Sequence, residues 1–182
     1  MMTLERKDSA RSLQVNVASD DSVIVAGYAS VFGIEDKGGD VVMAGAYARA
    51  LNALKAKGGG VKMLWQHDAT QPIGVWDTVH EDAHGLFVSG RLLTDVAKAR
   101  EAAALLGAGA IDGLSIGYRT VTARKNAKGQ RMLSDLELWE VSLVTFPMLP
   151  EARVTAKSED LPPLGSCAYA EALRRAQQQL AT

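Results

Sequence analysis

Hydrophobic and polar positions alternate along much of this chain, in short runs separated by glycine, proline and charged residues. Runs rich in β-branched and aromatic residues lie at 13–19, 22–32, 61–68, 72–93, 114–126 and 131–146. Runs of this kind with partial alternation are typical of strands that bury one face. A polar turn at 81–85 divides the longest run into two strands, and a turn at 127–130 joins the last two runs as a hairpin. The pattern therefore predicts a chain that is mainly β.

Two other segments have helical periodicity. Apolar residues recur at intervals of three and four within 44–60, and three glycines end that run. The alanine-rich segment 95–109 also ends in glycine. Thr94 is placed to cap its N-terminus, with Asp95 in the first turn, where the helix dipole favours an anion. Many strands with only two internal helices predict a mainly β fold with helices (α+β), a β-barrel that carries its helices outside.

Length and composition indicate how the chain is divided. A chain of 182 residues with 47% apolar residues is long enough to bury one sizeable core. The segment 157–182 begins with a proline-containing stretch of linker composition and ends in a run that favours a helix. We therefore expect one domain over 1–156, followed by a linker and a C-terminal helical tail that is dispensable for folding.

The charge balance excludes some classes of partner. Twenty basic and 21 acidic residues give a formal net charge of −1, so neither nucleic acid nor a membrane surface is an expected partner. No stretch approaches the eighteen or so apolar residues of a membrane span, and the charged start of the chain lacks the apolar core of a signal peptide. Cys167 is the single cysteine and has no internal disulfide partner, which is typical of a reducing, cytoplasmic compartment.

One serine stands between two glycines in the stretch GAIDGLSIGYRT (109–120). Gly113, Ser115 and Gly117 have the G-x-S-x-G spacing of a nucleophile elbow, in which a tight turn exposes the hydroxyl. Glycine and serine are equally the usual residues of an ordinary turn. The α/β-hydrolase form of the elbow is excluded, because its histidine follows the serine and no histidine follows Ser115 here. Triads are defined by geometry rather than chain order, so a residue earlier in the chain can still serve as the base for Ser115.

The histidines of the chain are His67, His80 and His84. His67 stands where a predicted strand gives way to a loop, a place where a side chain is held by a rigid scaffold yet open to a substrate. It is therefore the best candidate base for Ser115, with a surface loop histidine as the alternative. His80 and His84 flank the polar turn HEDAH. Their spacing is a weak metal-binding pattern outside a helix, and solvated turn residues are the simpler interpretation.

A third side chain is needed to orient the imidazole and to stabilise its charged form. The acidic candidates are Asp68, Asp112, Asp135, Glu137 and Glu140. Glu140 stands out because it interrupts the apolar strand LELWEVSLVTF, where a carboxylate on a buried face would need a partner. A carboxylate on the solvent face of a half-buried strand is the alternative.

Four ordered blocks of the sequence resemble a known family. They read GYASVFGIEDKGGDVVMAGAY, MLWQHDATQPIGVW, GAIDGLSIGY and DLELWEVSLVTFPMLPEARV. In this order, over about residues 25–156, they resemble the blocks of the phage prohead (capsid maturation) serine protease family of the HK97 type. One departure is the segment 147–150, which reads PMLP where the family usually has PANP. This segment is not expected to carry chemistry.

The resemblance implies a serine endopeptidase whose fold is related to the herpesvirus assembly proteases, a β-barrel surrounded by helices. It implies Ser115 as the nucleophile, His67 as the general base and Glu140 as the acid that orients the base. The herpesvirus relatives use a second histidine in that place. His80 and His84 are nevertheless less suited than Glu140, because both belong to a polar turn. Backbone N–H groups near 115–117 are one source of an oxyanion hole.

The same resemblance implies partners and a location. The substrates would be capsid-protein or scaffold segments inside the prohead, in the bacterial host cytoplasm. The chain itself is a further candidate substrate, with its tail 157–182 removed on maturation. The implied chemistry requires no metal or organic cofactor. Whether the chain forms a homo-oligomer is left open by the sequence. The sequence leaves two other functions open: a catalytically silent, scaffold-binding module of the assembling shell, and a small-molecule esterase that uses the same serine and histidine.

Overall fold

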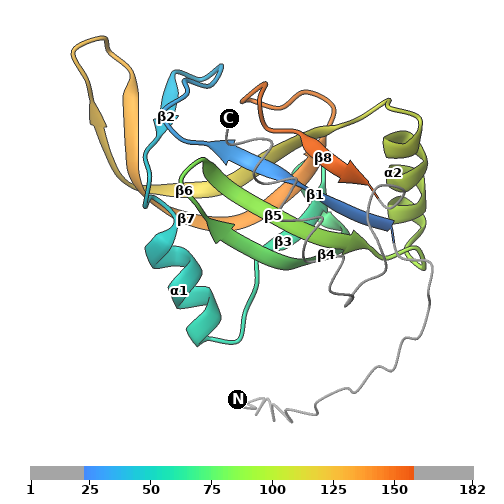
Figure 1. Cartoon of the computed structure of the whole chain (residues 1–182). Helices are drawn as coiled ribbons and strands as arrows, with labels where there is room; N and C mark the ends of the chain where they lie inside the picture. The colour runs from blue at the N-terminus through green and yellow to red at the C-terminus, as the bar shows by residue number, and fades with distance from the viewer. Residues whose placement is uncertain (1–22, 158–182) are drawn as a thin grey trace, which may run out of the picture.

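A computed structural model describes residues 23–157, which form a curled sheet with two helices outside it (Figure 1). The strands in this range are β1 (Val23–Val31), β2 (Asp40–Val42), β3 (Lys62–Trp65), β4 (Asp68–Glu81), β5 (Gly85–Leu92), β6 (Gly113–Lys125), β7 (Arg131–Val144) and β8 (Val154–Lys157). Their order in the sheet is β2-β7-β3-β4-β5-β1-β8, and β6 pairs with the other edge of β7. β2 and β3 run parallel to β7, whereas the remaining pairs are antiparallel.

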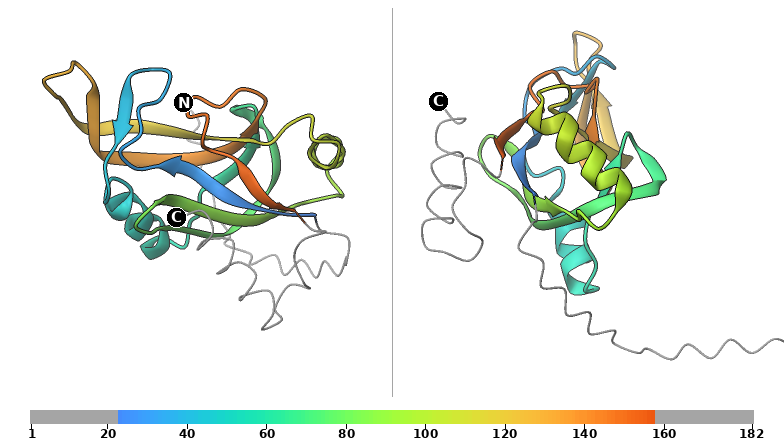
Figure 2. Two further views of the ribbon diagram at one scale, coloured as in Figure 1. Left: turned by 45° about the horizontal axis from the view of Figure 1, so that its top comes forward. Right: turned by 90° about the vertical axis from the view of Figure 1, so that its right-hand side faces the viewer.

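The sheet closes on itself where the start of β6 meets the segment before β8. The Leu114 N–H donates to the Ala152 carbonyl (2.9 Å), and the Val154 N–H donates to the Asp112 carbonyl (2.8 Å). Because β8 continues along β1, these bonds join the two ends of the sheet into a barrel, whose curvature is seen in Figure 2. Buried apolar side chains of the strands fill the core. They include Met63, Ile73, Phe87, Leu92, Leu114, Leu136 and Leu143.

Both predicted helices are present but are shorter than predicted. They are α1 (Ala48–Ala56), which packs against β4 and β7, and α2 (Ala97–Gly107), which packs against β4 and β5. The prediction that Thr94 caps α2 is wrong. The Val96 N–H donates to the Leu93 carbonyl (2.8 Å), so a turn uses these residues and the helix begins after them. Asp95 therefore precedes the first helical turn. No helix within 23–157 is long and apolar enough to span a bilayer.

The sequence pattern missed two short strands. β2 lies in the segment 33–42, whose glycines and charges predict a loop, and β8 follows the proline-containing segment 147–150. Each is stabilised by a longer strand that is remote in sequence, β7 for β2 and β1 for β8, so the local pattern could not reveal it. The predicted strand at 13–19 and the predicted tail beyond Lys157 lie outside the described residues.

Asp40 anchors β2 to its neighbours. Its buried carboxylate accepts two hydrogen bonds from the Arg131 guanidinium, one of them 2.6 Å long, and another from the Tyr118 hydroxyl (3.1 Å). The bond from Arg131 holds the pKa of Asp40 below its usual range, although burial acts in the opposite direction. Burial and the neighbouring Asp40 charge raise the pKa of Tyr118 to about 12.

Asp40→Asn is expected to destabilise the fold at neutral pH by roughly 1–3 kcal/mol, because charge-assisted hydrogen bonds are weakened. A carboxyl whose pKa is lower in the folded state contributes stability above its ordinary pKa, here 3.8. That contribution is lost as the pH falls through the folded value. The Tm difference between wild type and variant should therefore shrink below about pH 3.8, as thermal melts at a series of pH values would measure.

The matched control for this prediction is Asp135→Asn. This change weakens the pair between Asp135 and Arg49, whose side chains are 26% and 56% exposed, so its effect on Tm should be smaller. A Tm difference for Asp40→Asn that stays constant into strong acid would contradict the stabilising role of the Asp40 charge.

Candidate active site

Ser115 lies within β6, in regular strand rather than in a turn. It is opposite Ser142 of β7, and Gly117 is opposite Glu140. Both turn-based interpretations of the G-x-S-x-G stretch, the elbow and the ordinary turn, are therefore wrong. Side chains at alternate positions of a strand, and those directly opposite on its neighbour, share one face of the sheet. The side chains of Ser115, Ser142 and Glu140 consequently face the same side.

His67 belongs to a two-residue turn between β3 and β4. Gln66 and His67 both have left-handed backbone conformations (φ 52° and 62°), which are unfavourable for residues other than glycine. The Gln66 N–H donates to the Leu143 carbonyl (3.0 Å), and the His67 N–H donates to the Ser142 hydroxyl (3.1 Å). The Gln66 side chain also donates to the Thr145 hydroxyl (2.8 Å). A strained turn held in this way by the surrounding structure is typical of a functional site.

His67 and Glu140 are in direct side-chain contact. Nδ1 of His67 lies 2.5 Å from Oε1 of Glu140, a short hydrogen bond between imidazole and carboxylate. A carboxylate only accepts, so Nδ1 carries the proton, and Nε2 of the neutral ring is left as an acceptor. The Glu140 side chain is 10% exposed and the His67 side chain 42%, so the acid is shielded while the ring is open to solvent. A base and its orienting group have this arrangement.

The other acidic candidates are engaged elsewhere. Asp68 accepts hydrogen bonds from the backbone N–H (2.8 Å) and the hydroxyl (2.6 Å) of Thr70. The remaining three form ion pairs, Asp112 with Arg153, Asp135 with Arg49 and Glu137 with Arg119. Of the five acids considered, the structure brings Glu140 to the imidazole of His67.

His80 and His84 lie at the far end of β4 from His67. His67 immediately precedes this 14-residue strand, whereas His80 is its penultimate residue. The His84 ring packs edge-on against Tyr28, with centroids 4.5 Å apart, and the His80 ring tilts against Phe87 at 5.5 Å. Within residues 23–157, no three His, Cys, Asp or Glu side chains gather closely enough to hold a metal ion.

Two residues complete this arrangement in roles that the sequence analysis did not predict. The Ser142 hydroxyl donates to Oε2 of Glu140 (2.7 Å) while it accepts from the His67 backbone. Gly117 leaves room for the Glu140 carboxylate, because a Cβ at this position would lie 2.0 Å from Oε1. Strand periodicity contained a signal for both. Glu140 and Ser142 are alternate polar positions in an apolar strand, and a glycine inside a strand often marks a close approach.

Gly117→Ala is expected to displace the Glu140 carboxylate from His67 and to slow turnover by at least about tenfold, or 1.4 kcal/mol of barrier. The added methyl cannot coexist with Oε1 in its present position, so the orienting contact is lost. Steady-state kinetics with a thermal melt would measure this. Gly107→Ala is the matched control, because a Cβ there meets no atom within 4 Å, and its activity should stay at the wild-type level. A fully active Gly117→Ala would contradict the importance of the carboxylate position.

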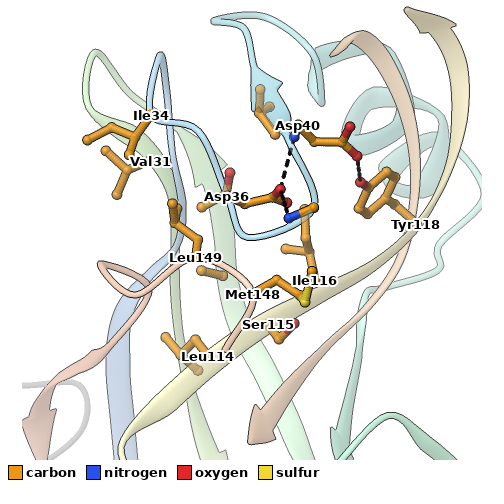
Figure 3. A pocket seen from close by; sticks show the side chains of 14 residues that line it. Val31, Ile34, Asp36, Asp40, Leu114, Ser115, Ile116, Tyr118, Met148 and Leu149 are labelled. Carbon is orange, nitrogen blue, oxygen red and sulfur yellow. Dashed lines mark hydrogen bonds between the residues drawn. The ribbon is translucent and has the colours of Figure 1, made fainter. Parts of the chain in front are cut away.

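A cavity of about 130 Å³ borders Ser115 (Figure 3). Its walls come from β1, the segment 34–42, β6 and the loop at 148–149, and most of the lining side chains are apolar. Asp36, Asp40 and Tyr118 are among its polar groups. Drug-sized ligands usually occupy pockets of about 300–1,000 Å³, so this recess is suited to one substrate side chain rather than to a whole small molecule.

Ser115 and His67 lie on either side of Ser142, which pairs with Ser115 across β6 and β7 and bonds to the turn that carries His67. In the described residues no hydrogen bond joins the Ser115 hydroxyl to the His67 ring. Such bonds are often long without substrate and shorten in the reacting complex. A serine, a histidine and a shielded carboxylate on one face of a sheet are the groups that acyl transfer requires.

Comparison of the sequence with models of known protein families identifies the family of this chain. The model of the family described as caudovirus prohead serine protease matches residues 11–165. The chain belongs to this family. The matched range includes β1 to β8 and all the residues of the candidate site, and the resemblance inferred from the four sequence blocks is confirmed.

A curated relative agrees with the family assignment. The prohead protease of Enterobacteria phage HK97 is 33% identical over 141 residues, which are 75% of this chain and 61% of that protein. The chain thus spans less than two thirds of the length of this relative.

Solved structures share the fold. The capsid assembly protease of bacteriophage T4 matches with a TM-score of 0.55 at 12% identity, over 66% of this chain and 81% of that one. The KSHV protease, solved in complex with a hexapeptide phosphonate inhibitor, matches with a TM-score of 0.51 at 11% identity, over 86% and 77%. The predicted mainly β fold, a barrel of the herpesvirus protease type with outer helices, is confirmed.

Proposed function

We propose that this chain is a serine endopeptidase of phage prohead maturation, which cleaves capsid-protein or scaffold segments inside the prohead in the host cell. Family membership and the 33% identity to the prohead protease of phage HK97 support this proposal. The observation that carries it is the contact between His67 and Glu140 on the face of the sheet that bears Ser115. A half-exposed histidine in a strained turn does little for barrel stability, so chemistry explains the arrangement better.

In the proposed mechanism, the Ser115 hydroxyl attacks a peptide carbonyl while Nε2 of His67 takes its proton. The C–N bond then breaks as His67 returns this proton to the leaving amine. Water, activated by the same nitrogen, hydrolyses the acyl-enzyme and regenerates Ser115. Glu140 keeps Nδ1 protonated throughout and stabilises the imidazolium that forms in each step.

One backbone donor is suitably directed for the oxyanion. The Leu114 N–H points away from β7 toward Ala152, and N–H directions alternate along a strand. The N–H groups of Ser115 and Gly117 therefore point toward β7, whereas that of Ile116 points away from it, to the side of the cavity. We infer that the Ile116 N–H is the candidate donor among residues 115–117.

Two other functions predict different behaviour. A catalytically silent scaffold-binding module would bind its partner without cleaving it, and it would gain nothing from a shielded acid beside an exposed histidine. A small-molecule esterase would need a larger recess than the cavity of about 130 Å³ next to Ser115.

Incubation of the chain with the capsid and scaffold proteins of its own phage, beside a chromogenic ester, separates the three functions. The proposal expects defined cleavage products from a protein substrate, and mass spectrometry should also reveal any cut within 157–182 of the chain itself. A serine-directed phosphonate should label Ser115 and no other serine. Ester hydrolysis without protein cleavage would favour the esterase, and binding without cleavage or labelling would favour the silent module.

A further inference from the structure

The hydroxyl of Ser142 is fully buried and uses both its donor and its acceptor function within the site. It donates to Oε2 of Glu140 (2.7 Å) and accepts from the His67 N–H (3.1 Å). Since Oε1 of Glu140 contacts Nδ1 of His67, these bonds form a closed ring through the backbone of His67, Ser142, Glu140 and the imidazole. Ser142 is therefore bonded to both members of the histidine–acid pair.

Each bond restrains a group that has freedom to move. The Glu140 side chain has three rotatable bonds, and the glycine at position 117 leaves its carboxylate without a methyl group to pack against. Ser142 holds one carboxylate oxygen, so rotation of the other oxygen away from the imidazole would break a hydrogen bond. The second bond holds the backbone of His67 at a φ of 62°, which is unfavourable for a histidine.

The surroundings of Ser142 argue against a role as a second nucleophile. Its side chain has no solvent exposure, and its proton is directed at Glu140 rather than at a base that could remove it. Ser115, opposite it on β6, borders the cavity, whereas Ser142 does not.

We propose that Ser142 is a positioning residue of the proteolytic site, which fixes the Glu140 carboxylate against Nδ1 of His67 and holds the turn that carries the imidazole. This inference rests on the proposed function and extends it, since it names a residue that acts on the reaction through two others. Removal of the hydroxyl should affect the chemical step rather than substrate binding, because Ser142 does not line the cavity.

The test compares the wild type with Ser142→Ala, Ser142→Thr, Glu140→Gln and the double variant Ser142→Ala/Glu140→Gln. Ser142→Ala should lower kcat at least about tenfold with KM within about twofold, and Ser142→Thr, which keeps the hydroxyl, should recover most of the rate. The double variant should be no slower than the slower single variant, because both changes break one unit. Ser89→Ala, at a buried serine on β5, is the matched control and should keep the wild-type rate.

Several outcomes would overturn the inference: a wild-type kcat for Ser142→Ala, rate losses that multiply in the double variant, or an equal loss in Ser89→Ala. If Ser142→Ala does not fold, Ser142→Cys, which is close in size but a weak donor, replaces it. A wild-type kcat for Ser142→Cys would likewise overturn the inference.

Hydrogen exchange of the His67 amide tests the inference without a measurement of activity. Exchange should become faster in Ser142→Ala. Unchanged exchange would contradict the claim that Ser142 holds the turn that carries His67. If the wild-type chain cleaves neither the capsid protein nor the scaffold protein, the proposed function itself is refuted.

Discussion

Replacing Ser115 by alanine is expected to abolish cleavage of the capsid or scaffold substrate and to leave the barrel folded. The proposed nucleophile has no substitute at the site, since the opposite hydroxyl of Ser142 is buried and bonded to Glu140. Loss of a serine nucleophile lowers kcat by a factor on the order of 10³ or more. Removal of one hydroxyl from a strand should move Tm by only a few degrees. Product analysis by mass spectrometry, together with a thermal melt, would measure both effects.

The control for Ser115→Ala is Ser134→Ala, which removes an exposed hydroxyl from β7 in the same sheet. This variant should cleave at the wild-type rate and keep its Tm. Residual proteolysis near the wild-type rate in Ser115→Ala would end the assignment of Ser115 as the nucleophile. Phosphonate labelling that persists in Ser115→Ala would point to another serine.

Glu140→Gln is expected to reduce activity by at least about tenfold, or 1.4 kcal/mol of barrier. Glutamine is close in size and can still bond to Ser142, but it carries no negative charge. The imidazolium that forms when His67 takes the Ser115 proton would lose its compensating charge, and the protonation of Nδ1 would no longer be imposed. Measurement of kcat and KM for Glu140→Gln, with a melt, would separate catalysis from stability.

His80→Ala and His84→Ala are the matched controls for Glu140→Gln. Both side chains pack against aromatic rings at the β4–β5 end of the barrel, away from the turn that carries His67. Each variant should keep a kcat close to the wild type, whatever its effect on Tm. A fully active Glu140→Gln, or a large fall in kcat in His80→Ala or His84→Ala, would show that another group orients the imidazole.

The two strands that carry Ser115 and Glu140 could be predicted from the sequence to within two residues. The runs at 114–126 and 131–146 correspond to β6 (113–125) and β7 (131–144), because alternation of apolar and polar positions is a local property that a half-buried strand imposes. Glu140 could be singled out for the same reason, since a carboxylate in an apolar strand needs a partner. The identity of that partner depended on the family resemblance and on the fold.

Other parts of the site depend on contacts that no local pattern describes. The G-x-S-x-G stretch indicates a turn by its composition, yet the second glycine is required by the Glu140 carboxylate, which comes from a neighbouring strand. The left-handed conformations of Gln66 and His67 contradict their residue types and persist because β7 holds them. At Thr94 the local sequence did contain the signal for a helix cap, but the prediction was wrong because the chain makes a turn there.

The hydrogen bonds that close the barrel also bear on when the proposed active site can assemble during synthesis of the chain. Ser115 follows directly on Leu114, whose N–H is held by Ala152, and the return bond from Val154 to Asp112 comes from the same late segment. A nascent chain that ends after Glu140 already includes His67 and Ser115 but still lacks the 152–154 backbone that holds the start of the strand bearing Ser115. Since the ribosome adds residues in order, we expect the barrel to close only after the segment around 152–154 has emerged. On the proposed mechanism, the order of translation is therefore expected to delay peptide cleavage until the barrel can close.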